Sequence, residues 1–212
     1  MYPQIENHLC DDFCPECHLL TCACLCGKVP RIKTEALFFL LVHSREVSKG
    51  SNTGHLLLNA LINCEYDIWS RVEPPKKLML YLKNQNHQPY LVFSADENQS
   101  ILASAHDLLE GQVKINTTRP LYILIDATWQ QARKMVRQSP YLKALPRISL
   151  KGIQKSHYRL RRNQQAGGMS TCEAAINLLQ EACELDNASA LQTYFQAFMQ
   201  HYEASMSGHG VR

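Results

Sequence analysis

Four cysteines early in this 212-residue chain have the types and spacing of a metal site. Cys14 and Cys17 form a CxxC knuckle, and Cys24 and Cys26 form a CxC pair shortly after it. Four thiolates at tetrahedral distance bind zinc well, and short spacings let one turn supply two ligands. Pro15 inside the knuckle argues against the alternative, a redox CxxC at a helix start. A closed four-sulfur site leaves no position open for chemistry, so we expect structural zinc, with iron as the alternative. Other possible ligands nearby are Cys10, His18 and Cys22.

A second group of polar residues lies where predicted strands end and helices begin. The apolar run 119–126 ends at Asp126 and is followed closely by Thr128 and Trp129. Ligands of parallel α/β sheets bind beyond the carboxyl ends of the strands, which makes these residues candidate contacts. The alternatives are that Asp126 or Thr128 only caps a helix and that Trp129 is part of the core. Hydroxyl, amide and glycine residues that open two further helices, and could hold an anionic group, are Ser51, Asn52, Thr53, Gly54, Ser170 and Thr171.

The 46 residues from 127 to 172 contain ten Lys or Arg residues and no Asp or Glu. Lys and Arg bind phosphates and steer polyanions to a surface, so this stretch predicts a nucleic acid or another phosphate-rich ligand. The alternative is a solvated basic face. No GxGxxG or GxxxxGK[ST] motif occurs, so neither a Rossmann dinucleotide site nor a P-loop is supported. The candidate phosphate contacts are Arg133, Lys134, Arg147, Arg159, Arg161 and Arg162.

The candidate site residues lie in a chain in which predicted strands and helices alternate. Such alternation predicts an α/β fold with a mostly parallel sheet flanked by helices. We expect a cysteine-rich zinc-binding appendage over 1–30, one α/β domain over 31–206 and a frayed tail over 207–212. The predicted strands are 36–44, 66–70, 89–94, 119–126 and 147–150, and the predicted helices are 51–63, 100–111, 127–138, 169–184 and 188–202; the segment 73–84 is ambiguous.

Composition excludes several protein classes. Hydrophobic residues make up 45% of the chain and charged residues 19%, which is ordinary globular usage and unlike a disordered, collagen-like or coiled-coil protein. The longest apolar run, 36–42, is far shorter than the ~20 residues of a membrane span. The first residues lack the basic start and apolar stretch of a signal peptide, and the cysteine count is odd. We therefore expect a cytoplasmic protein without a membrane partner.

Six motifs in order along the chain resemble the DTW-domain proteins. They are the cysteine cluster, SNTG (51–54), D-x-T-W (126–129), SPYLKALPR (139–147), YRLR (158–161) and STCEA (170–174). Together the motifs span most of the chain. Six motifs in the same order are a specific signature of the family, whereas one motif alone would be a weak one. The family usually has a proline after the histidine of the first strand and an arginine after SNTG, where this chain has Ser44 and His55.

The resemblance implies a tRNA-uridine aminocarboxypropyltransferase of the TDD superfamily, related to the SPOUT-type RNA enzymes and sharing their trefoil knot. Such an enzyme transfers the 3-amino-3-carboxypropyl group of S-adenosylmethionine to a uridine ring nitrogen in tRNA, which forms acp3U and releases 5′-methylthioadenosine. No obligate protein partner is implied. Two alternatives stay open: a SPOUT-type methyltransferase that uses S-adenosylmethionine, and a zinc-containing RNA-binding module without catalysis.

The resemblance also implies roles for individual residues within a catalytic domain over 31–206. Asp126 would act as general base or orient the uracil edge, Thr128 would hold the carboxylate, and Trp129 would stack on the uracil or the adenine. The amino and carboxylate ends of the donor would be clamped by Ser51, Asn52, Thr53, Gly54, Ser170 and Thr171. The basic residues of 127–172 would contact tRNA phosphates, and Arg147, Arg159 and Arg161 could also take the donor carboxylate.

Overall fold

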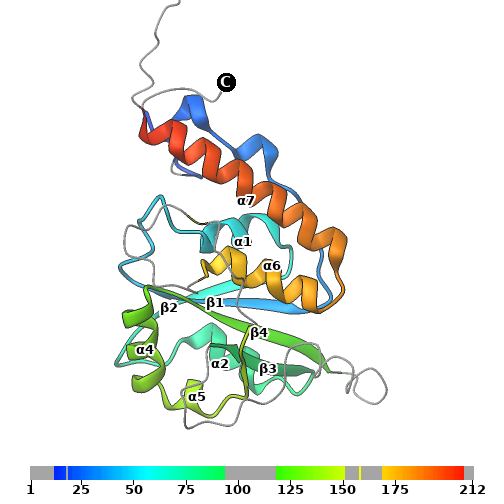
Figure 1. Cartoon of the computed structure of the whole chain (residues 1–212). Coiled ribbons are helices and arrows are strands. Elements are labelled where there is room, and N and C mark those ends of the chain that lie inside the picture. Colours follow the sequence, from blue (N-terminus) through cyan, green and yellow to red (C-terminus); the bar gives the residue numbers. More distant parts are fainter. Residues whose placement is uncertain (1–11, 18, 94–117, 151–157, 159–168, 208–212) are drawn as a thin grey trace, which may run out of the picture.

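The computed structural model describes residues 12–17, 19–93, 118–150, 158 and 169–207. Within these residues the chain forms a parallel five-stranded sheet in the order β2-β1-β4-β3-β5 (Figure 1). The strands are β1 (Leu37–His43), β2 (Cys64–Trp69), β3 (His87–Val92), β4 (Arg119–Asp126) and β5 (Arg147–Ile148). The predicted α/β class with a parallel sheet is thus confirmed.

Helices cover both faces of the sheet (Figure 1). One face carries α1 (Gly54–Ala60), α6 (Thr171–Glu181) and α7 (Leu185–Met206), and the other carries α2 (Lys76–Lys83), α4 (Trp129–Gln138) and α5 (Pro140–Lys143). Each face has its own apolar core. Phe38, Leu40 and Leu124 point toward the first set of helices, and Phe39 and Ile123 point toward the second. This division follows from the alternation of side chains along a strand.

The central strands β1 and β4 explain where the polar residues gather. Both are almost entirely apolar because both of their faces are covered by helices. Val42 of β1 is paired in register with Asp126 of β4. Since all strands run in the same direction, the segments after β1, β3 and β4 leave the sheet at the same edge. That edge collects residues 51–54, Phe93 and Asp126.

Several predicted boundaries shift in the structure. The helix expected over 51–63 begins only at Gly54, because the side chain of Asn52 accepts a hydrogen bond from the Gly54 N–H and folds the preceding loop. The ambiguous segment 73–84 contains α2, and the last helix is longer than expected. The predicted helix 100–111 lies outside the described residues. The expected trefoil knot depends on a chain path through 151–157 and 159–168, which also lie outside them.

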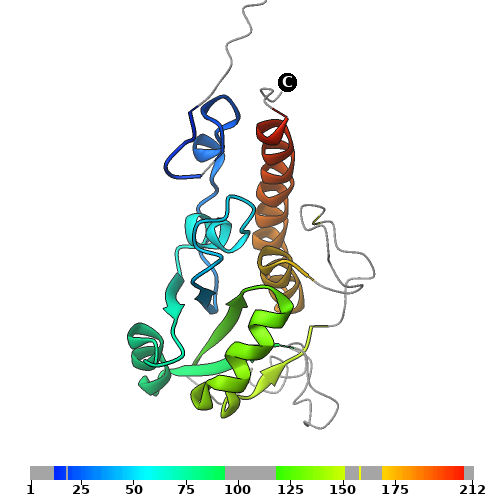
Figure 2. The ribbon, with the colours of Figure 1, turned by 90° about the vertical axis from the view of Figure 1, so that its left-hand side faces the viewer.

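The cysteine-rich segment lies along the C-terminal half of α7 (Figures 1 and 2). It contains two short 3-10 helices, Thr21–Ala23 and Cys26–Lys28. The Leu20 N–H donates to Ser205 Oγ at 3.0 Å, and His201 Nδ1 donates to Ala23 O at 2.8 Å. The predicted appendage is therefore fastened to the last helix of the fold by hydrogen bonds.

Among the residues that the structure describes, no helix has the length and apolar character that crossing a membrane requires.

Candidate functional site

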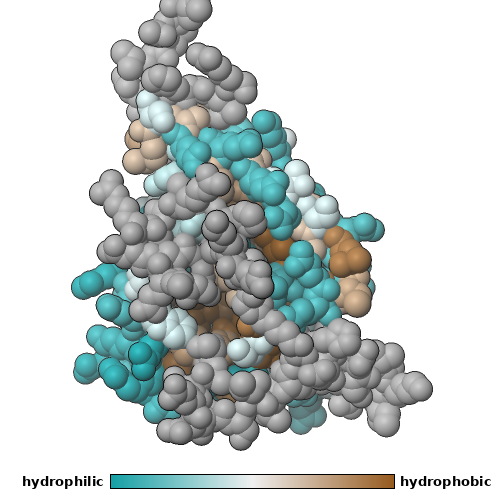
Figure 3. Space-filling view, in the orientation of Figure 1, coloured by the Kyte–Doolittle hydropathy of each residue, from teal (hydrophilic) through white to brown (hydrophobic). Residues whose placement is uncertain are grey.

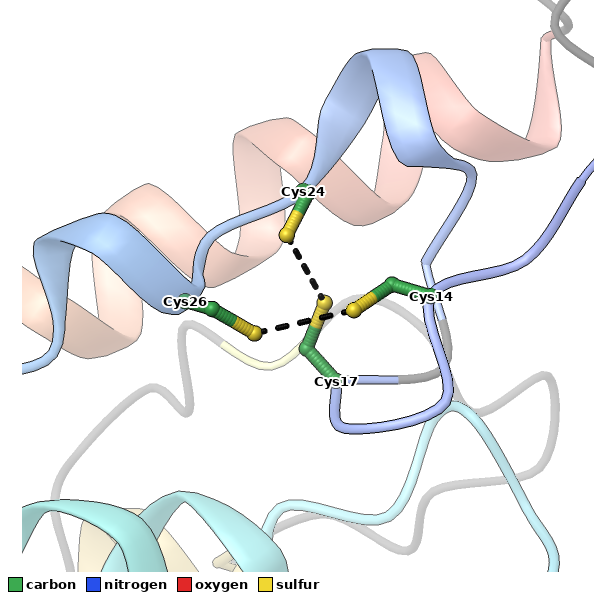
Figure 4. A group of neighbouring side chains, drawn as sticks. All are labelled: Cys14, Cys17, Cys24 and Cys26. Carbon is green, nitrogen blue, oxygen red and sulfur yellow. Dashed lines mark hydrogen bonds between the residues drawn. The ribbon is translucent and has the colours of Figure 1, made fainter.

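The four predicted cysteine ligands converge on one point (Figure 4). Their Sγ atoms all lie within 4.8 Å of one another, with 3.7 Å between Cys14 and Cys26 and 3.8 Å between Cys17 and Cys24. A tetrahedral site with zinc–sulfur bonds of about 2.3 Å separates its sulfurs by roughly 3.8 Å. The sulfur positions therefore fit a four-cysteine metal site. Cys22 is exposed and outside this cluster, while Cys10 and His18 lie outside the described residues.

The electrostatics of the cluster also favour a cation. Backbone N–H groups of Cys17 and Glu16 lower the pKa of Cys14 to about 6, so this thiol ionises readily. Burial, together with the neighbouring thiols, raises the pKa of Cys26 above its usual value. Four thiolates this close would repel one another without a positive charge among them. A divalent metal removes that repulsion, and four protein ligands leave it no open position for catalysis.

Asp126 forms a second centre, at the carboxyl end of β4. Its side chain is 1% exposed. Asn52 Nδ2 donates to its Oδ2 at 2.7 Å, and Thr171 Oγ1 donates to its Oδ1 at 2.8 Å. The carboxylate therefore joins three segments that are distant in sequence: the end of β4, the loop before α1 and the start of α6. The structure brings together the predicted base and the predicted donor-binding residues.

The loop before α1 is shaped to fit this carboxylate. Asn52 Nδ2 also donates to Glu46 O at 3.0 Å, while Asn52 Oδ1 accepts from the Gly54 N–H at 2.7 Å. A Cβ atom on Gly54 would lie 2.5 Å from Asp126 Oδ2, so only glycine fits at this position. The Thr53 hydroxyl accepts from the Cys172 N–H at 3.3 Å, which ties the loop to α6 directly.

The start of α6 is fixed by a capping box. Ser170 Oγ accepts from the Glu173 N–H, and Glu173 Oε2 accepts from the Ser170 N–H. The other carboxylate oxygen of Glu173 accepts from the Tyr158 N–H, and the Tyr158 hydroxyl donates to Ser51 O at 2.5 Å. Tyr158 thus connects α6 to the loop before α1. Its neighbours Arg159, Arg161 and Arg162 lie outside the described residues.

Thr128 and Trp129 occupy the start of α4. Thr128 Oγ1 accepts from the Gln131 N–H, and Gln131 Oε1 accepts from the Thr128 N–H. Thr128 therefore caps α4, which was the alternative to its holding the Asp126 carboxylate. Trp129 is 41% exposed, unlike a core residue. Its ring stacks on Phe93 with centroids 5.0 Å apart and 15° between the planes. Arg147 lies over the Phe93 ring at 5.8 Å and is buried.

The predicted basic contacts differ in accessibility. Arg133 and Lys134 are exposed on α4, and the space-filling view shows hydrophilic residues over this helix with apolar ones beside it (Figure 3). Arg147 is only 8% exposed, so its guanidinium packs behind the surface. Charge pattern alone could not separate an exposed arginine from one packed on an aromatic ring.

Sequence reasoning did not identify His43, at the end of β1. Its ring stacks on Trp69 with centroids 5.9 Å apart. Burial lowers the pKa of His43, and the charges of Arg45, Lys134 and Lys49 lower it further against an opposing effect of Glu46. Phe93 and Tyr158 were also missed as site residues. Two signals were available: His43 and Phe93 each end or directly follow a buried apolar run, and Tyr158 is the first residue of the YRLR motif.

A family model described as the DTW domain matches residues 11–203, which is most of the chain. The match contains the cysteine cluster, Asp126 with its hydrogen-bond donors, and nearly all of α7. No solved structure matches the chain.

Proposed function

This chain belongs to the DTW-domain family, and on that premise we propose that it transfers the 3-amino-3-carboxypropyl group of S-adenosylmethionine to a ring nitrogen of a uridine in tRNA. Membership of the family is consistent with a tRNA-modifying activity. The observation that most supports the proposal is the tethering of Asp126, at a strand end, to both segments proposed to hold the donor.

The reaction needs little beyond positioning and one proton transfer. The uridine N3 forms a bond to the γ-carbon of the methionine chain, the bond from that carbon to sulfur breaks, and 5′-methylthioadenosine leaves with the electron pair. The sulfonium is already activated, so the remaining barrier includes removal of the N3 proton. A positioned carboxylate that accepts this proton contributes typically about 10²–10⁴-fold.

Asp126 is the proposed acceptor of this proton, or the group that orients the uracil edge. Both of its oxygens accept hydrogen bonds within the protein, and the side chain is 1% exposed. The base role therefore requires that RNA binding exposes one oxygen. Thr171 is half-buried and lies nearer the surface than Asn52, so we propose that its side of the carboxylate faces the uracil.

The proposed donor contacts divide into two groups. Asn52, Thr53 and Ser170 are buried, and their side chains accept or donate hydrogen bonds within the protein. These three would act by fixing the shape of the loop and of the α6 start. Ser51 and Thr171 are half-buried, so we propose that they and nearby backbone N–H groups contact the donor's amino and carboxylate ends.

The test is mass spectrometry of tRNA nucleosides after incubation of an unmodified tRNA with the protein and S-adenosylmethionine. We expect acp3U in the RNA and 5′-methylthioadenosine in solution. A methylated uridine with S-adenosylhomocysteine would instead identify a methyltransferase. Binding of tRNA with neither product would identify a non-catalytic RNA-binding module.

The role of Asp126 is tested by Asp126→Asn. The amide has the shape of the carboxylate, and the Thr171 hydroxyl can turn to accept where it now donates, so the network can be kept. We expect a loss of transfer of about 10²-fold or more with the fold retained. Asp186→Asn, on the exposed first turn of α7, is the matched control. Wild-type activity of Asp126→Asn would remove the base role.

A further inference from the structure

Trp129 and Asp126 lie three residues apart but on different sides of the sheet. Asp126 is in register with Val42 and meets Asn52 and Thr171 on the α1 and α6 side. Trp129 stacks on Phe93, whose ring belongs to the core on the α4 and α5 side. The indole and the carboxylate therefore contact different sets of residues, although the two residues are close neighbours in sequence.

The indole stacks on a buried aromatic ring. Phe93 is 8% exposed and lies nearly parallel to Trp129 at 5.0 Å, and the buried Arg147 guanidinium lies over the same phenyl ring. Phe93 directly follows β3, Trp129 is the first residue of α4, and Arg147 is the first residue of β5. Trp129 is nevertheless 41% exposed. A flat and accessible aromatic surface is what unpaired nucleobases stack on.

The positive charges near the indole favour a negatively charged ligand. Arg133 and Arg137 follow Trp129 at intervals of four residues on α4, and both are exposed. Residues at this spacing lie along one face of a helix. No acidic residue occurs in α4. An exposed ring followed by two guanidinium groups suits a base with its attached phosphates, whereas a protein partner with a neutral surface would gain nothing from the cations.

We propose that Trp129, supported by Phe93 and Arg147, is a stacking platform for an unpaired RNA base next to the modified uridine, and that it is separate from the site of the modified base itself. This proposal depends on the proposed function in one respect: it assumes that the bound RNA carries a uridine to be modified. Phe93 and Arg147 are positioning residues, because they hold the indole without themselves offering an exposed ring face.

The platform can be tested without any catalytic readout. The probes are a hexamer of uridylate and an abasic hexamer of the same charge, each titrated into the full-length metal-loaded protein. We expect the wild type to bind the uridylate hexamer more tightly than the abasic one. Trp129→Leu should lower the affinity for uridylate by about five- to a hundredfold, as loss of one stacked base does, and leave abasic binding unchanged. Phe93→Leu, which loosens the support, should show an intermediate loss.

Fluorescence supplies an independent readout, because the chain has only two tryptophans. Uridylate should quench the wild-type emission, and Trp129→Phe, which leaves only Trp69, should abolish that quenching. Tyr66→Leu is the matched control, since Tyr66 is an exposed ring on β2 with a lysine over it; it should bind as the wild type does. Equal affinity of Trp129→Leu and wild type for uridylate would overturn the platform. Absence of acp3U with base-dependent quenching intact would overturn the proposed function alone.

Discussion

Replacing Gly54 with alanine tests whether the loop before α1 is fitted to Asp126. The added Cβ would lie 2.5 Å from Oδ2 and 2.7 Å from Cγ, whereas ordinary contacts of a Cβ begin near 3.4 Å. The carboxylate would have to move by roughly 0.9 Å, the difference between 3.4 and 2.5 Å. Its hydrogen bonds to Asn52 and Thr171, now 2.7 and 2.8 Å long, cannot both survive such a movement.

Two opposing effects set the size of the change in stability. Alanine is the better helix former and would stabilise α1 by about 0.5–1 kcal/mol if it fitted. Overpacking of a filled site destabilises by about 1–3 kcal/mol, and disruption of buried hydrogen bonds adds to this. We therefore expect Gly54→Ala to lower the free energy of unfolding by about 1–2 kcal/mol. A misplacement of about 1 Å should also reduce transfer by up to ~10²-fold.

Urea denaturation and single-turnover transfer of the carboxypropyl group measure the two effects separately. Gly27→Ala is the matched control, because a Cβ at Gly27 would meet no atom within 4 Å. This control should retain wild-type activity. If Gly54→Ala were more stable than the wild type and fully active, the close fit between the glycine and the carboxylate would be refuted.

Two further predictions concern the cysteine cluster and His43. Elemental analysis should detect a metal in the wild type and none in Cys24→Ser, because three thiolates remain of four; Cys183→Ser, which changes an exposed thiol outside the cluster, should match the wild type. The lowered pKa of His43 means that the folded state favours the neutral ring. The contribution of this neutral ring to the free energy of unfolding is therefore complete above about pH 6.5, and it is lost as the pH falls toward the folded-state pKa of His43. His43→Gln should therefore show a smaller decrease in urea midpoint between pH 7.5 and pH 5 than the wild type; an identical decrease would contradict the assignment.

The strands that carry the site were predictable because their signal is local. The predicted strands 36–44 and 119–126 match β1 and β4 closely, since strands buried on both faces need continuous apolar sequence. The cysteine ligands were predictable for the same reason, because each pair lies within one turn. The capping box of Ser170 and Glu173 follows from their spacing alone.

Contacts between distant segments could not be predicted. Nothing in the sequence indicates that Asn52 and Thr171 meet the same carboxylate, because the fold alone brings these segments together. Arg147 was expected at the surface on charge, yet it packs on Phe93, where its planar group lies against an aromatic ring. Both cases depend on tertiary geometry that leaves no periodic pattern in the chain.

The attachment of the cysteine segment to α7 links the order of synthesis to the order of assembly. Leu20 and Ala23 leave the ribosome long before their hydrogen-bond partners on α7, Ser205 and His201. The nascent segment can therefore dock only after the chain has been extended by the 185 positions that separate Leu20 from Ser205. A metal bound by the thiols in that interval would keep the segment folded on its own, and would protect the reactive sulfurs until α7 has been synthesised.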